Sequence, residues 1–104
     1  MKKMNISSIL DFTSEKSTRK AIFKEGRLDT GLLLYAPGQT TPGHKHADLD
    51  EVFYVISGEG IITINDEKVP VKENDIIFSP MEETHGFYNN SSENWVVLQI
   101  KIEH

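Results

Sequence analysis

The chain has 104 residues, of which 38% are hydrophobic and 26% charged, an ordinary composition for one globular domain. Eleven basic residues against sixteen acidic ones give a net charge of −5, and no Lys/Arg cluster is present, so we expect neither nucleic acid nor an anionic membrane surface as a partner. The absence of cysteine excludes disulfides, thiolate metal sites and cysteine catalysis.

The first 17 residues are mainly polar with a few apolar side chains, a pattern that predicts an irregular arm or a short edge strand. Polar residues interrupt the apolar stretch that a signal peptide needs, and no apolar run is long enough to span a bilayer. We therefore expect a cytoplasmic protein.

From about residue 19 onward, short runs of β-branched and aromatic residues alternate with turn signals made of Gly, Pro, Asn or Asp. The predicted strands are residues 21–23, 32–35, 52–56, 61–64, 76–78, 85–88 and 95–102. No long stretch has helical periodicity. This pattern predicts an all-β antiparallel sandwich or barrel. We expect a single domain over residues 1–104, with an N-terminal arm over residues 1–18.

Three of the four histidines and one glutamate are candidate metal ligands. His44 and His46 are two residues apart, so on an extended strand their side chains project from the same face. Glu51 starts the following predicted strand and His85 a later one; three imidazoles with a carboxylate suit a divalent transition metal better than Ca or Mg. Asp50 competes with Glu51 as the carboxylate ligand, and periodicity does not decide between them, because the residues that follow are apolar on both faces. Taken alone, His44 and His46 are better explained as surface-loop histidines.

The segment from Gly38 to Gly58 resembles the first motif of the cupin family, G-x5-H-x-H-x(3–4)-E-x6-G, and meets each fixed position. The second cupin motif, G-x5-P-x-G-x2-H-x3-N, is met at Pro80, His85 and Asn89. The resemblance covers roughly residues 32–89, most of the chain.

The resemblance implies a double-stranded β-helix, the jelly-roll or cupin barrel. It also implies that His44, His46, Glu51 and His85 point into the barrel and bind one divalent transition metal, which would be Mn, Fe, Ni, Zn, Co or Cu. The family position selects Glu51 over Asp50 as the carboxylate ligand.

Two glycines of the second motif are replaced, by Asn74 and Glu82. Asn tolerates the left-handed backbone of a turn glycine, whereas Glu does so only at a cost, so we expect the loop over residues 80–84 to depart from the family shape. Glu82 and Glu83 could supply a base beside the metal, but a charged surface loop is the favoured interpretation.

The resemblance leaves the reaction open, because cupin barrels carry many chemistries. We expect a small metal-dependent enzyme acting on a small organic molecule, first of dioxygenase type and second an isomerase or decarboxylase. The alternative is a non-catalytic module that binds a sugar or another metabolite. A second titratable group in the cavity would favour the enzyme, and the candidates are Tyr35, Tyr54, Tyr88 and Glu82.

We also expect a homodimer. The arm carries the apolar residues Ile6, Ile9, Leu10 and Phe12, which need to be covered. Small domains often gain stability by association, edge strands invite pairing, and small cupins are commonly dimers.

Overall fold

The computed structural model describes residues 1–45 and 47–104. Its elements are η1 (Ile6–Ile9), β1 (Thr18–Glu25), β2 (Leu28–Tyr35), β3 (Thr40–His44), β4 (Leu49–Ser57), β5 (Glu59–Ile64), β6 (Glu67–Lys72), β7 (Ile76–Ser79), β8 (His85–Tyr88) and β9 (Trp95–Glu103). All seven predicted strands are confirmed, and β3 and β6 were missed. In the described part of the chain, no helix is long and apolar enough to cross a membrane.

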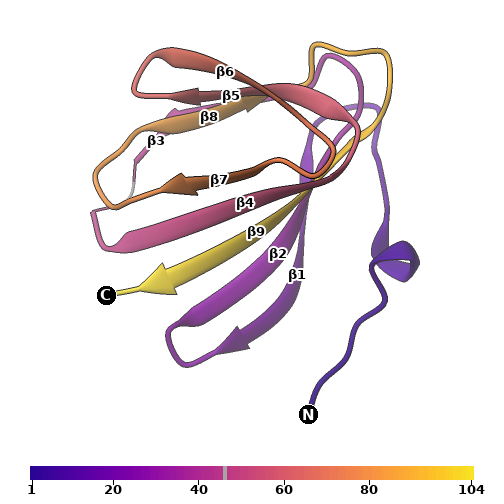
Figure 1. Cartoon of the computed structure of the whole chain (residues 1–104). Helices are drawn as coiled ribbons and strands as arrows, with labels where there is room; N and C mark the ends of the chain where they lie inside the picture. The colour runs from indigo at the N-terminus through magenta and orange to yellow at the C-terminus, as the bar shows by residue number, and fades with distance from the viewer. Residues whose placement is uncertain (46) are drawn as a thin grey trace.

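The strands form two antiparallel sheets that face each other (Figure 1). The five-stranded sheet has the order β1-β2-β9-β4-β7, and the four-stranded sheet has the order β3-β8-β5-β6. The chain crosses between the sheets several times, so that β4 and β9 pair although they are far apart in sequence. This is the expected jelly-roll, and the predicted fold class is confirmed.

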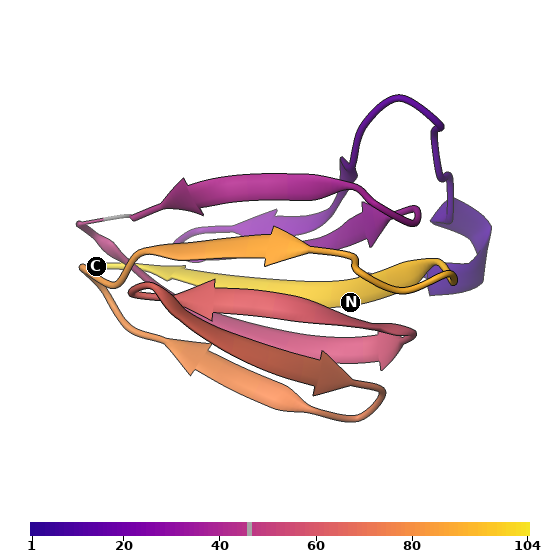
Figure 2. The ribbon, with the colours of Figure 1, turned by 90° about the horizontal axis from the view of Figure 1, so that it is seen from above.

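Apolar side chains fill two separate regions. Inside the barrel, the largest buried residues are Trp95, Tyr35 and Phe53. On the outer face of the five-stranded sheet, a second cluster is centred on buried residues of β2 and β9 and is partly covered by the arm. Its members include Leu32, Leu34, Val96, Ile6, Ile9 and Phe12. The arm therefore folds back over its own sheet, with η1 at one end of the molecule when seen from above (Figure 2).

The two turns that lack the motif glycines both use a left-handed backbone. Asn74 has φ 76° and Glu82 has φ 75°. Asn74 adopts the left-handed backbone, as expected. Glu82 adopts it as well and carries the strain of a side chain in this region, while the expected departure of the loop over residues 80–84 from the family shape stays a prediction.

Candidate metal and ligand site

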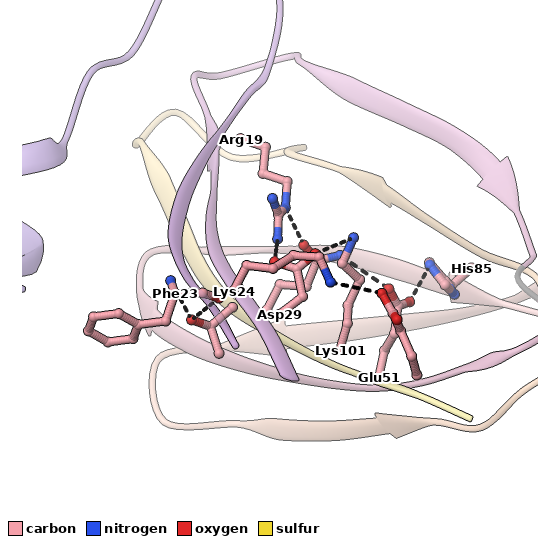
Figure 3. A network of polar contacts seen from close by, with 10 residues as sticks. Arg19, Phe23, Lys24, Asp29, Glu51, His85 and Lys101 are labelled. Atoms are coloured by element: carbon pink, nitrogen blue, oxygen red, sulfur yellow. Dashed lines mark hydrogen bonds and ion pairs between the residues drawn. The ribbon is translucent and has the colours of Figure 1, made fainter. Parts of the chain in front are cut away.

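A buried carboxylate and a buried imidazole face each other inside the barrel. Glu51 on β4 is 1% exposed and His85 at the start of β8 is 2% exposed. Glu51 Oε2 lies 2.7 Å from His85 Nε2 (Figure 3). The other ring nitrogen of His85, Nδ1, lies 3.3 Å from Ser79 Oγ. The rings of Phe53 and His85 pack edge-on, with their centroids 5.3 Å apart. These contacts fix the imidazole with Nε2 toward the carboxylate.

His44 lies beside this pair because β3 and β8 place it directly opposite His85 in register. The centroids of the two imidazole rings are 4.5 Å apart. His44 Nδ1 lies 3.1 Å from the carbonyl oxygen of Pro42, which can only accept a hydrogen bond. This contact places the proton of a neutral His44 on Nδ1 and its lone pair on Nε2, the nitrogen that we expect to bind a metal.

The structure also distinguishes the two neighbouring carboxylates. Asp50 accepts a hydrogen bond from Met81 N at 2.9 Å, and its Oδ2 lies 2.5 Å from Nε2 of His104. These hydrogen bonds, the backbone one first, hold the pKa of Asp50 below its ordinary value. Glu51 is therefore the carboxylate inside the barrel, while Asp50 belongs to an exposed pairing with the C-terminal residue.

The fourth predicted ligand, His46, lies outside the described residues. Within residues 1–45 and 47–104, no group of three or more His, Asp or Glu side chains is arranged to hold a metal ion. The donor chemistry of the described ligands nevertheless fits a first-row ion. A carboxylate oxygen and an imidazole nitrogen, both withdrawn from water, converge on one point with a second imidazole beside them.

A chain of polar contacts extends from Glu51 across the inner face of the five-stranded sheet. Gln99 Nε2 donates to Glu51 Oε1 at 3.2 Å, and Arg19 Nε donates to Gln99 Oε1 at 2.7 Å. Because Arg19 can only donate, it fixes which end of the Gln99 amide faces Glu51. Gln99 is thereby held as a donor that orients the carboxylate.

Arg19 and Lys101 share one carboxylate behind the cavity. Asp29 Oδ1 lies 3.1 Å from Arg19 Nη2, and Asp29 Oδ2 lies 3.4 Å from Lys101 Nζ (Figure 3). Burial raises the pKa of Asp29, but the hydrogen bond and charge of Arg19, followed by those of Lys101, together lower it by more, so the net pKa is below its ordinary value. Asp29 is therefore ionised at neutral pH and balances one of the two cations.

Strand register explains why these residues meet. Asp29, Lys101 and Glu51 stand opposite one another on β2, β9 and β4, and directly opposed residues point to the same face. On the adjacent inner rung, Gly31 faces Gln99. A Cβ at Gly31 would lie 2.7 Å from Arg19 Cζ, so the glycine provides the space that the guanidinium occupies.

These residues border a cavity of about 310 Å³, near the lower end of the range for ligand pockets. The cavity is lined by Ser17, Thr18, Arg19, Leu33, Tyr35, Thr41, His44, Phe87, Gln99 and Lys101. Its lining contains two basic side chains, Arg19 and Lys101, and no carboxylate among the described residues. The predicted ligand His44 lies on this wall, and Gln99 connects the cavity to Glu51.

Of the four proposed titratable groups, only Tyr35 lines this cavity. Burial raises the pKa of Tyr35 to about 12, although its hydrogen bond to Thr41 acts in the opposite direction. Tyr35 is thus a neutral hydroxyl at physiological pH. Tyr54 instead donates to Asn74, Tyr88 is exposed, and Glu82 pairs with Lys45 across an exposed loop at 3.8 Å.

The sequence analysis missed Arg19, Asp29, Gln99 and Lys101. The available signal was the alternation of β9, in which Gln99 and Lys101 continue the face that begins with Trp95 and Val97. That signal was ambiguous, because the opposite face of β9 is apolar as well.

Comparison with known proteins agrees with the fold. The family model described as "Cupin domain" matches residues 31–101. A protein of Thermotoga maritima named oxalate-binding protein is 29% identical over 85 residues, which cover 82% of this chain and 69% of that protein. A gentisate 1,2-dioxygenase of a Ralstonia species is 32% identical over 76 residues, which cover 69% of this chain and 21% of that enzyme, so the chain matches about a fifth of its length.

Among solved structures, TT1209 from Thermus thermophilus superimposes with a TM-score of 0.93 at 23% identity. The match covers 99% of this chain and 98% of that one. At this identity the likeness establishes the fold and nothing beyond it.

Proposed function

Because this chain belongs to the cupin domain family, we propose that it is a small metal-dependent enzyme that acts on a small organic molecule inside its barrel. A dioxygenase-type reaction is the first candidate, and an isomerase or decarboxylase reaction is the second. The observation that carries the proposal is the buried Glu51–His85 pair beside a cavity that His44 lines.

Glu51, His85 and His44, together with His46, would hold the metal. When bound, a divalent transition metal would act as a Lewis acid on the substrate or, if redox-active, support a reaction with dioxygen. The protein's own part is positional. Gln99 holds Glu51, Ser79 holds His85, and Pro42 O sets the tautomer of His44.

The names of the relatives support chemistry on small molecules. The Ralstonia relative is a dioxygenase, which favours the first candidate reaction. The Thermotoga relative is named for binding, which favours the alternative of a non-catalytic metabolite-binding module. Tyr35 is neutral and the described cavity lining contains no carboxylate, which leaves little acid–base machinery beside the proposed metal ligand His44. This favours either the binding module or a purely metal-centred oxygenase.

The first test is metal analysis of protein purified without added metal or chelating resin. We expect about one transition metal ion per chain, and a tenfold or greater loss of metal affinity in Glu51→Gln and His46→Ala. Asp50→Asn is the matched control, because Asp50 is adjacent to Glu51 but lies outside the barrel. Metal bound only by the folded state raises the melting temperature, so chelator should lower it.

Metal binding would be refuted if the purified protein contains no metal and its melting temperature is unchanged by chelator and by added Mn, Fe, Ni, Co, Cu or Zn. Oxygen-uptake screening of the loaded protein with small organic substrates then separates the two functions. Substrate-dependent uptake supports the dioxygenase, whereas binding without turnover supports the binding module.

A further inference from the structure

We propose that the cavity selects small organic molecules that carry a carboxylate group, which Arg19 and Lys101 hold against the cavity wall. This inference names the class of ligand for the proposed function. It rests on that function, because it takes the cavity to be the ligand site. The reasons are the charge of the cavity, the directions of its donors and its size.

The charge of the cavity is opposite to that of the whole protein. The chain has a net charge of −5, yet the described cavity wall contains Arg19 and Lys101 and no carboxylate. Asp29 lies behind the wall and is shared by both cations. Asp29 is the carboxylate that directly contacts both cations, and Glu51 is turned toward His85, so the cavity wall itself presents cationic groups and no carboxylate among the described residues. A partly enclosed positive charge favours an anion, because surrounding water screens the attraction less than at an open surface.

The cations also retain hydrogen-bonding capacity. Within the described part of the chain, Arg19 uses Nε for Gln99 and Nη2 for Asp29, so Nη1 is available to a ligand. Lys101 Nζ has a single described contact, with Asp29 at 3.4 Å. Both side chains remain partly accessible, at 33% and 20% exposed. Arg19 on β1 and Lys101 on β9, with β2 between these strands, present donors on the same face, and two such donors suit the two oxygens of a carboxylate.

Charge and volume together narrow the ligand. A planar guanidinium beside an ammonium suits the two oxygens of a single carboxylate. A cavity of about 310 Å³ accommodates a small molecule, and Leu33 and Phe87 supply apolar contact for its remaining part. The hydroxyls of Tyr35 and Thr41 provide further polar contacts on the same wall.

Gln99 links this anion site to the proposed metal site. Its amide connects Arg19 to Glu51 through hydrogen bonds of 2.7 and 3.2 Å. A carboxylate held by Arg19 would therefore lie within the cavity that leads to Glu51, His85 and His44. Arg19 and Lys101 act as specificity-determining residues, and Gln99 is a positioning residue.

The test is isothermal titration with benzoate and benzamide, which have nearly the same shape but differ in charge. Inorganic phosphate is the third probe, and each is titrated into chelator-treated and metal-loaded protein. We expect benzoate to bind at least tenfold more tightly than benzamide and phosphate in both preparations. Arg19→Gln and Lys101→Met should each weaken benzoate binding about tenfold, whereas Lys20→Met, on the same strand but paired with Asp11, should not.

Far-UV circular dichroism verifies that each variant is folded, and Lys101→Met serves if Arg19→Gln does not fold. Equal binding of benzoate and benzamide, tighter binding of phosphate, or benzoate binding that neither variant weakens would overturn the inference. If benzoate binding requires metal and neither variant weakens it, the inference is overturned and the proposed function stands. If the variants weaken benzoate binding but the protein takes up no metal, the inference is supported and the proposed function loses its metal dependence.

Discussion

Asp29 determines how the two cations of the cavity are held. Its side chain is 14% exposed and contacts both Arg19 and Lys101. Without its charge, two partly buried cations would lose the carboxylate that contacts both of them, so Asp29 contributes to stability as well as to the shape of the site.

We expect Asp29→Asn to lower the free energy of unfolding at pH 7 by about 1–2 kcal/mol, because charged hydrogen bonds to Arg19 and Lys101 are lost. The pKa of Asp29 is lowered in the folded state, so its contribution is present above the unfolded pKa of about 4. It disappears as the pH falls through the lower, folded-state pKa. The wild-type advantage over Asp29→Asn should therefore shrink in acid.

Urea denaturation of both proteins in chelator, between pH 7 and the lowest pH at which they still fold, measures this difference. Taking the difference between the two proteins removes the contributions of the other carboxylates. An advantage that is constant across the whole range would show that Asp29 does not act through its charge.

At the scale of the element, the turn between β7 and β8 contains an avoidable strain. Glu82 adopts φ 75° in the loop that precedes His85, and its only described ion pair is an exposed contact with Lys45. Exposed pairs of this kind contribute little, so nothing described nearby offsets the left-handed backbone.

We expect Glu82→Gly to raise the free energy of unfolding by about 0.5–1 kcal/mol. Removing Cβ relieves roughly 1–2 kcal/mol of left-handed strain, and the greater freedom of glycine in the unfolded chain cancels part of this gain. Thermal denaturation should show a melting temperature higher by about 2–6 °C. Glu82→Ala, which removes the charge but keeps Cβ, is the matched control and should show no such rise. Equal rises in both variants would assign the effect to charge.

Local sequence predicted the strands that are rich in β-branched and aromatic residues. It did not predict β3, which contains Pro42 and Gly43, or β6, which contains Pro70 among charged residues. Both are edge strands of the four-stranded sheet, where a missing backbone donor is tolerated. Propensity alone opposes both strands, and pairing with β8 and β5 overrides it.

The site was predictable where a spaced motif specified it and unpredictable where strand register assembled it. His44, Glu51 and His85 came from the motif, and the structure brings them to one end of the barrel. Lys101 was missed because β9 has two apolar faces. Val96 and Leu98 point to the outer face, where the second apolar cluster lies, so hydrophobic alternation does not reveal which face is the interior.

At the scale of the whole molecule, the outer face of the five-stranded sheet is only partly covered. Ile6, Ile9 and Phe12 pack on their own sheet, so these arm residues no longer support association. The part of the same face that the arm leaves uncovered supports association instead. Phe78 and Ile76 on the edge strand β7 are 61% and 69% exposed. Phe78 continues in register through Val52 to Ile100, which extends the apolar surface across three strands.

We therefore keep the prediction of a homodimer and propose this outer face as its interface. Sedimentation velocity at micromolar concentration should give twice the chain mass of 11.8 kDa. A lysine at position 78 would bury a charge at the interface, so Phe78→Lys should shift the protein to the monomer. Tyr88→Lys, at an exposed aromatic residue of the other sheet, is the control. A wild-type mass near 11.8 kDa would refute the dimer.

The space above Gly31 makes the ligand preference of the cavity easy to change by a single substitution. The three atoms nearest to a Cβ at this position all belong to the guanidinium group of Arg19. The strands could keep their register while the guanidinium swings away, and alanine is better than glycine inside a strand by roughly 0.5–1 kcal/mol. A single nucleotide change in a glycine codon produces alanine. A descendant of this protein could thus lose its preference for anions in one mutational step, although the loss of the Arg19 contacts with Gln99 and Asp29 would offset the gain from alanine.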